Sequence, residues 1–398
     1  MRSLFSLLQR VWHATANWML ALTVAGIAIN LLAFAALEVR DLVKAHGAGI
    51  VANDPWAERV KAMPGWNRAD VYALHMESWE GRKYEYAPMV QFREAPSRGR
   101  FVNVSEHGFR EGGQKNPWPP DPRRASIFVF GGSTIFGYGI PDNETVPSNL
   151  QTILAGQDRE IAVYNFGRAY YFSTHEMLLF EKLLLSGIRP DVAVFVDGLN
   201  DFYHRDTDFI WTDRLKRLSE GNSFTIGNAS KYLLEQLPAH ELMRFALSRL
   251  TSAQTDRRHQ ARENVARIVE SGRSDLADKV LKRYQRNQKI VRALAGTGSI
   301  RTLFVWQPVP MYGYDLKHHL FAYREMGDHK SATAGYAAAR RQFEAGAFGT
   351  DFLWCADIQK DEKRALYVDA VHYNPVLSRK FAGCIADRLQ SIVQPRTP

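Results

Sequence analysis

Five short apolar runs, separated by helix-length amphipathic stretches, constrain the fold of this chain more than any other feature. Each run is rich in β-branched and aromatic residues and is continuous rather than alternating; the runs lie at 126–130, 161–164, 191–196, 302–306 and 351–354. Continuous apolar strands are typical of a parallel sheet that is buried on both faces. Because parallel strands need crossover helices, such as the one expected over residues 173–186, the pattern predicts a three-layer αβα domain.

An uncharged segment of 27 residues, from 11 to 37, lies near the N-terminus. As a helix with a rise of about 1.5 Å per residue it would extend roughly 40 Å, more than the ~30 Å hydrocarbon core of a bilayer. Its most apolar part, residues 18–37, predicts an uncleaved single membrane anchor. The alternatives are a cleaved signal sequence and a buried core helix. Basic residues flank the segment on both sides and guide the orientation only weakly; we expect a cytoplasmic N-terminus and an exported C-terminal domain.

The chain therefore divides into an anchor over 1–40, a membrane-proximal segment over 41–125 and an α/β domain over 126–398. Between the third and fourth strands, residues of about 205–300 form a helical insertion. The membrane-proximal segment is rich in aromatic residues and ends in the proline cluster of residues 116–122, which can continue neither a helix nor a central strand. We expect this segment to be irregular and to pack on the α/β domain.

The net charge of +9 comes from 51 Lys and Arg against 42 Asp and Glu, and most of it lies in one region. Residues 205–300 hold 18 basic and 11 acidic side chains. On a shared helix face, these basic residues could contact anionic lipid headgroups or an acidic polysaccharide; the alternative is an ordinary solvated face. We expect no nucleic-acid partner, because the basic residues lack interleaved aromatic residues.

Candidate functional residues stand where several of the predicted strands end. Ser133 follows the first strand, Gly167 the second and Asn200 the third, while Asp369 and His372 lie on a loop after the fifth. Ligands of open parallel sheets bind beyond the carboxyl ends of the strands, so these residues should converge at one edge. A hydroxyl, an imidazole, a carboxylate and hydrogen-bond donors are together the components of acyl transfer through a serine nucleophile.

At these positions, and over roughly residues 125–392, the chain resembles the SGNH (GDSL-like) hydrolase family at all four of its usual blocks. The resemblance implies that Ser133 is the nucleophile, His372 the base and Asp369 the residue that orients the base. It also implies an oxyanion hole formed by the backbone N–H groups of Ser133 and Gly167 and the side-chain amide of Asn200. The implied fold is a flavodoxin-like αβα sandwich.

Two further stretches bear on this resemblance. Gly132 stands where the name-giving motif of the family has Asp, a departure that many members share. The stretch from Phe101 to Arg110 is similar to an Asn…Gly-Phe-Arg stretch that precedes the first block in some bacterial members.

Rival motifs are incomplete in this sequence. Ile135 takes the place of the last glycine in Gly-x-Ser-x-Gly, and Asp142 takes the place of the third glycine of a dinucleotide fingerprint. Cys355 and Cys384 are 29 residues apart and have no metal-binding spacing. They form either one disulfide or two buried thiols. We expect neither a metal nor another cofactor.

These patterns together predict a serine esterase of the ester-hydrolase class. Its expected substrate is an acyl group, acetyl above all, on a hydroxyl of an envelope glycan or a related molecule. The glycan follows from the anchor and from the habits of the family, because no residue in the sequence selects it. The alternatives are an O-acyltransferase that modifies polysaccharides and a non-catalytic assembly protein with the same fold.

Overall fold

The computed structural model describes residues 2–46, 55–155, 160–203, 237–251, 274–322, 329 and 331–392. The chain divides into two compact units. One comprises Met1–Ala52 with Lys216–Thr255, and the other comprises Asn53–Leu215 with Asp256–Pro398. The predicted insertion is thus shared between the two units, and the membrane-proximal segment from Asn53 onwards belongs with the sheet.

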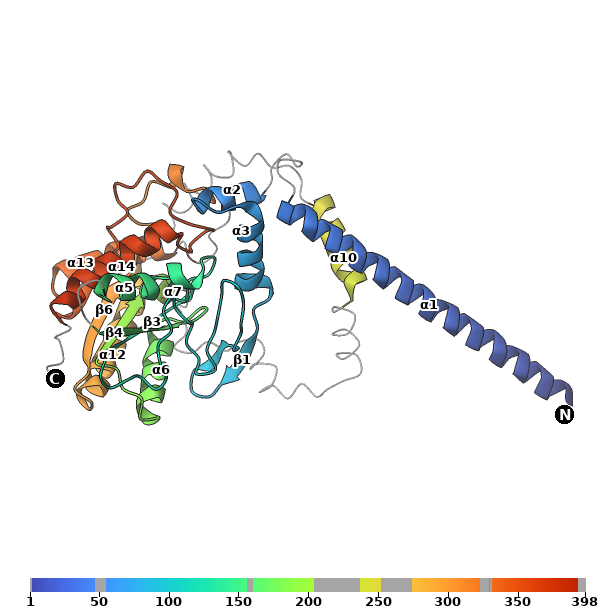
Figure 1. The fold of residues 1–398 in the computed structure, drawn as a ribbon, viewed down its shortest axis with the longest axis horizontal. Coiled ribbons are helices and arrows are strands. Elements are labelled where there is room, and N and C mark those ends of the chain that lie inside the picture. Colours follow the sequence, from blue (N-terminus) through green and yellow to red (C-terminus); the bar gives the residue numbers. More distant parts are fainter. Residues whose placement is uncertain are drawn as a thin grey trace. The chain divides into compact units, whose positions relative to one another are not determined.

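The second unit is built on a five-stranded parallel sheet (Figure 1). The strands are β3 (Ala125–Gly131), β4 (Ile161–Gly167), β5 (Val192–Asp197), β6 (Arg301–Trp306) and β7 (Phe352–Trp354), and they follow the order β4-β3-β5-β6-β7. Each strand coincides with one of the apolar runs, so the predicted parallel sheet is confirmed. The chain leaves β3 for β4 on one side and later returns to β5 on the other. The strand order therefore reverses between the carboxyl ends of β3 and β5, the position where ligands bind in such folds.

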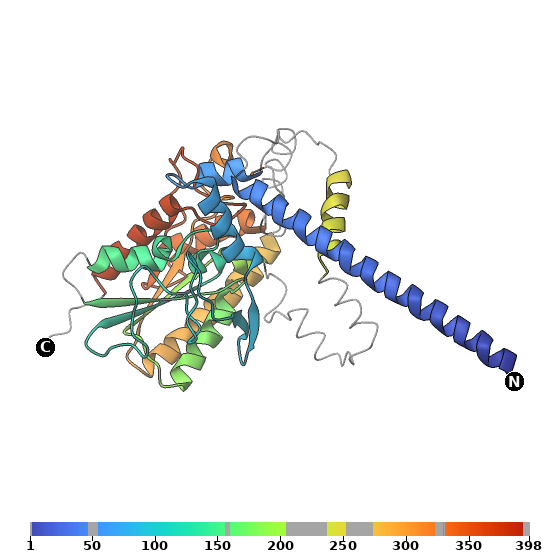
Figure 2. The same ribbon diagram turned by 45° about the vertical axis from the view of Figure 1, so that its right-hand side comes forward.

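Helices cover both faces of this sheet, which confirms the three-layer architecture. Helices α5 (Val146–Ala155) and α14 (Pro375–Gln390) share one core with strand side chains such as Ile127 and Val129. Helices α6 (Ser173–Leu185), α12 (Ser274–Gly296) and α13 (Ala332–Glu344) share the other core, with Phe128 and Phe130 from the same strand. Figure 2 shows α5 and α14 on one side of the sheet and α6 and α12 on the other. Successive side chains of a strand thus point to opposite faces of the sheet and pack in different cores.

Helix α12 lies within the predicted insertion, yet it is a covering helix of the sheet. Its residues Val280, Leu281 and Tyr284 are buried in the core. Its exposed face carries basic side chains spaced by three or four residues, namely Lys279, Lys282, Arg286 and Lys289. This part of the predicted basic surface therefore shares one helix face. The basic residues predicted between 257 and 267 lie outside the described residues.

The membrane-proximal segment contains more regular structure than its sequence indicated. It forms α2 (Pro55–Ala62), α3 (Arg68–His75), the π-helical turn η1 (Met76–Glu80) and an antiparallel hairpin of β1 (Tyr84–Ala87) and β2 (Gln91–Glu94). Asn67 caps α3 by accepting a hydrogen bond from Asp70 N at 2.8 Å. The segment packs on the sheet domain as expected; for example, Asn374 Nδ2 donates to Ala62 O at 3.0 Å.

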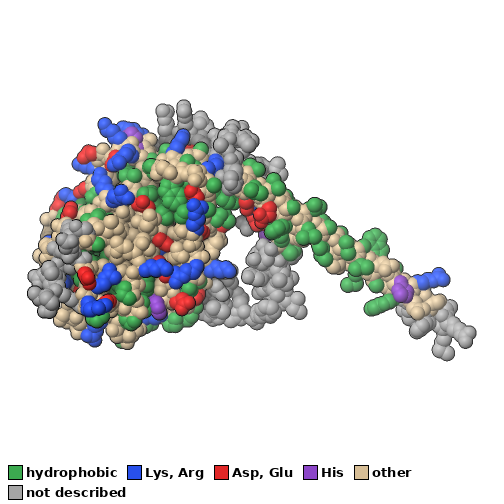
Figure 3. Space-filling model, viewed as in Figure 1, with side chains coloured by type: hydrophobic (Ala, Val, Ile, Leu, Met, Phe, Trp, Pro, Cys, Tyr) green, Lys and Arg blue, Asp and Glu red, His purple; other side chains and the backbone are tan. Residues whose placement is uncertain are grey.

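The first unit holds α1 (Arg2–His46) and α10 (Pro238–Thr251). Helix α1 is long and apolar enough to cross a membrane from Gln9 to Val43, and a signal sequence would have the same character. Its hydrophobic side chains lie exposed along the helix (Figure 3). Helix α10 packs beside its second half, where Ala239 N donates to Asn30 Oδ1 at 3.2 Å. Because α1 carries these exposed apolar side chains, the alternative of a buried core helix is wrong.

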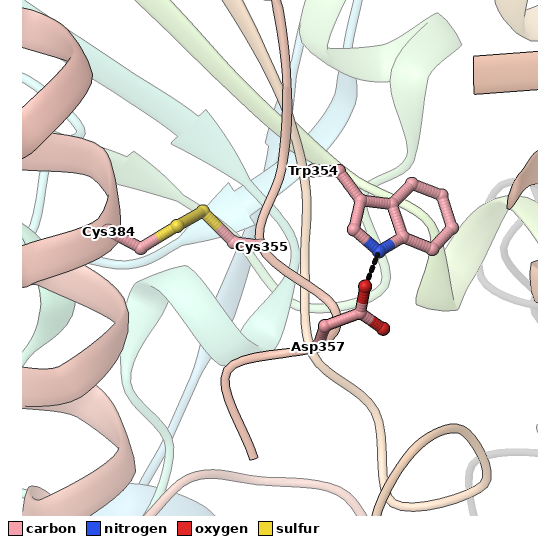
Figure 4. Close-up of a disulfide and its surroundings, with 4 residues drawn as sticks. All are labelled: Trp354, Cys355, Asp357 and Cys384. Atoms are coloured by element: carbon pink, nitrogen blue, oxygen red, sulfur yellow. Dashed lines mark hydrogen bonds between the residues drawn. A yellow bond between two sulfur atoms is a disulfide. The ribbon is translucent and has the colours of Figure 1, made fainter. Parts of the chain in front are cut away.

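A disulfide joins Cys355, directly after β7, to Cys384 on α14 (Figure 4). The Cα atoms of the two cysteines are 6.3 Å apart. Both residues lie in the core that α14 shares with the sheet. The disulfide therefore resolves the choice that the sequence left open between a bridge and two free thiols.

Replacing both cysteines with alanine should lower the free energy of unfolding by about 3–4 kcal/mol, because the bridge closes a loop of roughly 30 residues and restricts the unfolded chain. Urea unfolding of the two proteins without reductant measures the difference. Reductant should destabilise the natural protein and leave the double variant unchanged. Equal stability of the two proteins under oxidising conditions would contradict the prediction.

Candidate active site

Ser133 stands at the carboxyl end of β3, as the first residue of the short helix α4 (Ser133–Phe136). The turn before it is tightly packed. A Cβ atom at Gly132 would lie only 2.3 Å from Asn200 Nδ2 and 3.0 Å from Tyr171 O. A side chain at position 132 would displace Asn200 or the chain at Tyr171, so glycine leaves both in place directly before the serine.

The three predicted catalytic side chains form one continuous hydrogen-bonded chain. His372 Nε2 lies 2.8 Å from Ser133 Oγ. On the other side of the ring, His372 Nδ1 lies 2.7 Å from Asp369 Oδ2. Asp369 and His372 come from the loop between β7 and α14, which reaches back across the sheet edge to Ser133. This is the geometry of a nucleophile, a base and the carboxylate that orients the base.

The carboxylate of Asp369 is well prepared to hold an imidazolium ion. Its Oδ1 accepts two backbone hydrogen bonds, from Val371 N at 2.9 Å and from His372 N at 2.8 Å. Burial acts to raise the pKa of Asp369, but the charge of His372 and these hydrogen bonds outweigh burial and hold the pKa well below its ordinary value. Asp369 is therefore ionised at neutral pH.

Asn200 reaches the nucleophile from the third strand. It belongs to α7 (Leu199–Tyr203), directly after β5, and the turn before it uses Gly198 with a φ of 121°. The side-chain nitrogen of Asn200 donates one hydrogen bond to Tyr171 O at 2.7 Å. An amide nitrogen carries two N–H groups, so the second can serve an oxyanion beside Ser133.

Gly167 is the last residue of β4 and lies beside α4, and its N–H group already donates a hydrogen bond. Gly167 N donates to Asn165 Oδ1 at 3.0 Å. A Cβ atom at Gly167 would lie 2.2 Å from Phe136 N, so the absence of a side chain lets β4 approach α4 closely. The assignment of this N–H group to the oxyanion hole stays a prediction, whereas its packing role is visible in the structure.

Two buried polar residues hold the far end of α4, and the sequence alone gave neither of them this role. Asn165 Nδ2 donates to Ile135 O at 2.9 Å. Arg110 donates to the carbonyl groups of Phe136, Gly137 and Ile140 and to Asp142 Oδ1, at distances from 2.6 to 2.8 Å. Together they satisfy carbonyl groups at the C-terminal end of α4, the helix that begins with Ser133. For Arg110, the sequence signal was the similarity of residues 101–110 to the Asn…Gly-Phe-Arg stretch of some bacterial members.

A buried acidic cluster lies beside Asn200, at the carboxyl end of β5. Asp201 accepts a hydrogen bond from Ser173 Oγ at 2.6 Å and another from Gly198 N at 3.2 Å. Burial, and next the charges of neighbouring aspartates, raise the pKa of Glu176 and the pKa of Asp197 well above their ordinary values. Burial therefore favours the neutral form of both carboxyl groups.

Aromatic side chains pack around His372. The ring of Trp79 lies edge-on with its centroid 6.0 Å from that of His372, and the ring of Tyr138 lies at 5.6 Å. Trp79 comes from the π-helical turn of the membrane-proximal segment, so that segment forms one wall of the site. The sequence showed that the segment was rich in aromatic residues, but not that one of them would contact the base.

Replacing Asn200 with alanine should lower kcat for an ester substrate by about 10²–10³-fold, because one preorganised oxyanion donor is lost. Steady-state kinetics with an aryl acetate measures the effect. The exposed Asn143 serves as a matched control, and its replacement with alanine should leave kcat unchanged. A loss of less than threefold in the Asn200 variant would remove Asn200 from the oxyanion hole.

Among the residues that the structure describes, no group of three or more His, Cys, Asp or Glu side chains is arranged to hold a metal ion.

Comparisons with known proteins gave matches among solved structures. No protein-family model and no curated protein matches the chain. A protein assigned to the G-D-S-L lipolytic family, from Desulfitobacterium hafniense, is 12% identical with a TM-score of 0.35; the match covers 67% of this chain and 99% of that one. An acetyl xylan esterase is 15% identical with a TM-score of 0.35, covering 66% and 99%. A lipase/acylhydrolase from Enterococcus faecalis is 14% identical with a TM-score of 0.32, covering 69% and 99%.

Proposed function

We propose that this protein is a serine esterase of the SGNH type, which removes an acyl group from a hydroxyl by acyl transfer. The observation that carries the proposal is the hydrogen-bonded chain from Ser133 Oγ through His372 to Asp369, with distances of 2.8 and 2.7 Å. Such a chain converts a weakly nucleophilic hydroxyl into one that can attack an ester.

The reaction proceeds in two halves. Ser133 Oγ attacks the ester carbonyl carbon and gives its proton to His372 Nε2, while Asp369 stabilises the resulting imidazolium ion. The oxyanion accepts hydrogen bonds from Ser133 N and Asn200 Nδ2. Gly167 N is the third proposed donor, and to serve in this role it must turn from Asn165 Oδ1 to the oxyanion. His372 then protonates the leaving alcohol, and an acyl-enzyme remains on Ser133.

In the second half, water attacks the acyl-enzyme with His372 as the base, and the carboxylic acid leaves. We propose acetyl as the preferred acyl group and an envelope glycan, or a related hydroxyl compound, as its carrier. If a sugar hydroxyl replaced water in this half, the same residues would catalyse O-acyl transfer to a polysaccharide.

We also propose that α1 anchors the protein, with its N-terminus in the cytoplasm and the sheet domain outside. The length and apolar surface of the helix support an anchor. The disulfide supports an oxidising compartment for the second unit. The exposed basic face of α12 is suited to anionic surfaces, such as lipid headgroups or an acidic polymer.

The decisive experiment uses the full chain in detergent micelles with a fluorophosphonate probe and an aryl acetate. We expect one adduct, located on Ser133 by peptide mass spectrometry, and turnover of the aryl acetate that the probe abolishes. A folded protein that neither reacts with the probe nor hydrolyses the ester would overturn the proposed function. Faster release of the acyl group on addition of an oligosaccharide acceptor, with transfer to the sugar, would favour the acyltransferase.

A further inference from the structure

Tyr170 is an exposed aromatic residue held in a strained backbone conformation next to the proposed oxyanion hole. Tyr170 is 53% exposed, and its φ is 59°, in the left-handed region. A residue other than glycine rarely adopts this conformation, and where it does, surrounding contacts must hold it there.

Those contacts come from the residues on either side. Ala169 N donates to Glu94 Oε1 at 2.8 Å. Tyr171 buries its ring and donates its hydroxyl to Phe92 O at 2.6 Å, while its carbonyl group accepts from Asn200. Because both neighbours are fixed, the chain between them turns outward and presents the ring of Tyr170 to solvent.

A second aromatic ring stands beside it. Tyr203 lies at the end of α7, one helical turn beyond Asn200, and its ring centroid is 6.2 Å from that of Tyr170. The ring of His329 stacks on Tyr203 at 4.8 Å. Each of two proposed oxyanion donors is thus followed, three residues later, by a tyrosine: Gly167 by Tyr170, and Asn200 by Tyr203. We call the rings of Tyr170 and Tyr203 the tyrosine platform.

The immediate surroundings of Ser133 are densely packed in comparison. A Cβ atom at Gly131 would lie 2.5 Å from Ile135 Cγ1, and the side chain of Asn200 fills the space beside Gly132. Thr134, Ile135 and Phe136 are all buried behind the nucleophile. Tyr170 thus presents an exposed aromatic ring outside the serine, with the half-buried ring of Tyr203 beside it.

We propose that the tyrosine platform holds the pyranose ring that carries the ester. This inference rests on the proposed esterase function. A sugar ring presents a flat face of C–H groups and an edge of hydroxyl groups. Tyrosine offers a broad apolar face whose negative electrostatic potential attracts C–H groups, and it can remain exposed between substrates. Stacking on Tyr170 sets the sugar beside the oxyanion donors, with its ester directed at Ser133.

The test compares two substrates on the full chain in detergent micelles: p-nitrophenyl acetate, which has no sugar, and partially acetylated xylo- and gluco-oligosaccharides. In Tyr170→Ala, the ratio of kcat/KM for the sugar ester to that for the aryl ester should fall about tenfold, mainly through a higher KM. Tyr170→Phe keeps the stacking face and should keep the ratio. Leu185→Ala, which truncates an exposed apolar side chain at the C-terminal end of α6, is the matched control for surface truncation.

A second variant separates binding from folding. Glycine adopts the left-handed conformation without strain, so Tyr170→Gly should unfold at the same urea concentration as the natural protein or at a higher one. Its ratio of kcat/KM for the sugar ester to that for the aryl ester should fall as far as in Tyr170→Ala. An unchanged ratio in both variants, or an equal loss with both substrates, would overturn the platform. A natural protein that reacts with the fluorophosphonate and hydrolyses the aryl ester but no sugar ester would also overturn it, while leaving the esterase proposal intact.

Discussion

Replacing Ser133 with alanine should lower kcat for an aryl acetate by about 10⁴-fold or more and abolish labelling by a fluorophosphonate. In the proposed reaction, Ser133 Oγ is the atom that forms the acyl-enzyme, so alanine at this position removes the nucleophile. The remaining oxyanion donors would leave only a weak acceleration over water, as they do when a triad serine is lost.

Three controls make this result specific. His372→Ala should lose nearly as much activity as Ser133→Ala, and the double variant should lose little more, because the two residues act as one unit. Ser186→Ala, at the end of α6, should behave like the natural protein. Urea unfolding should show that Ser133→Ala remains folded. Residual activity above about 1% with an intact fold, well above the loss expected for a triad serine, would show that another residue is the nucleophile.

Replacing Arg110 with methionine should lower the free energy of unfolding by about 3–5 kcal/mol. The guanidinium group is fully buried, and it bonds three carbonyl groups and Asp142. Methionine fills much of the volume but donates nothing, so the carbonyl groups and the carboxylate lose their partners without gaining water. We also expect a lower kcat, because α4 would no longer hold Ser133 in place.

The matched control is Arg98→Met. Arg98 pairs with Glu111 on the surface, and its side chain is 65% exposed. Loss of an exposed ion pair changes stability by about 0–1 kcal/mol. Urea unfolding of both variants, with equal dependence on denaturant concentration, gives the comparison. Similar stabilities for the two variants would show that Arg110 is not the support of α4 that its contacts indicate.

The sheet was predictable from the sequence because each strand is built on a continuous apolar run, and the three strands β3, β4 and β5 are buried at every position. The same logic placed Ser133, Asn200 and the Asp369–His372 loop at one edge, since parallel strands share the direction of their carboxyl ends. These predictions depend only on local pattern and on the topology of parallel sheets. They did not require knowledge of any individual side-chain contact.

The parts that the sequence did not reveal depend on tertiary contacts. The buried role of Arg110 arises only when α4 and the Asn…Gly-Phe-Arg stretch meet. The helices and hairpin of residues 55–94 are short and are stabilised by packing on the sheet domain, so their own sequence gives a weak signal. The hydrogen bond from Gly167 N to Asn165 Oδ1 is another contact of this kind. The family resemblance assigns the Gly167 N–H group to the oxyanion hole, but in the structure the side chain of Asn165 accepts its hydrogen bond.

The disulfide has a further consequence for the integrity of the site. Asp369 and His372 both lie on the stretch between Cys355 and Cys384, so the base and its carboxylate sit within a covalent ring. A protease that cut the exposed turns of this ring once would leave both ends attached to the sheet and to α14. The two fragments would stay linked, with the imidazole still tethered near the serine. During proteolysis, the oxidised chain would thereby tolerate a nick in the loop that carries Asp369 and His372, whereas a reduced chain would not.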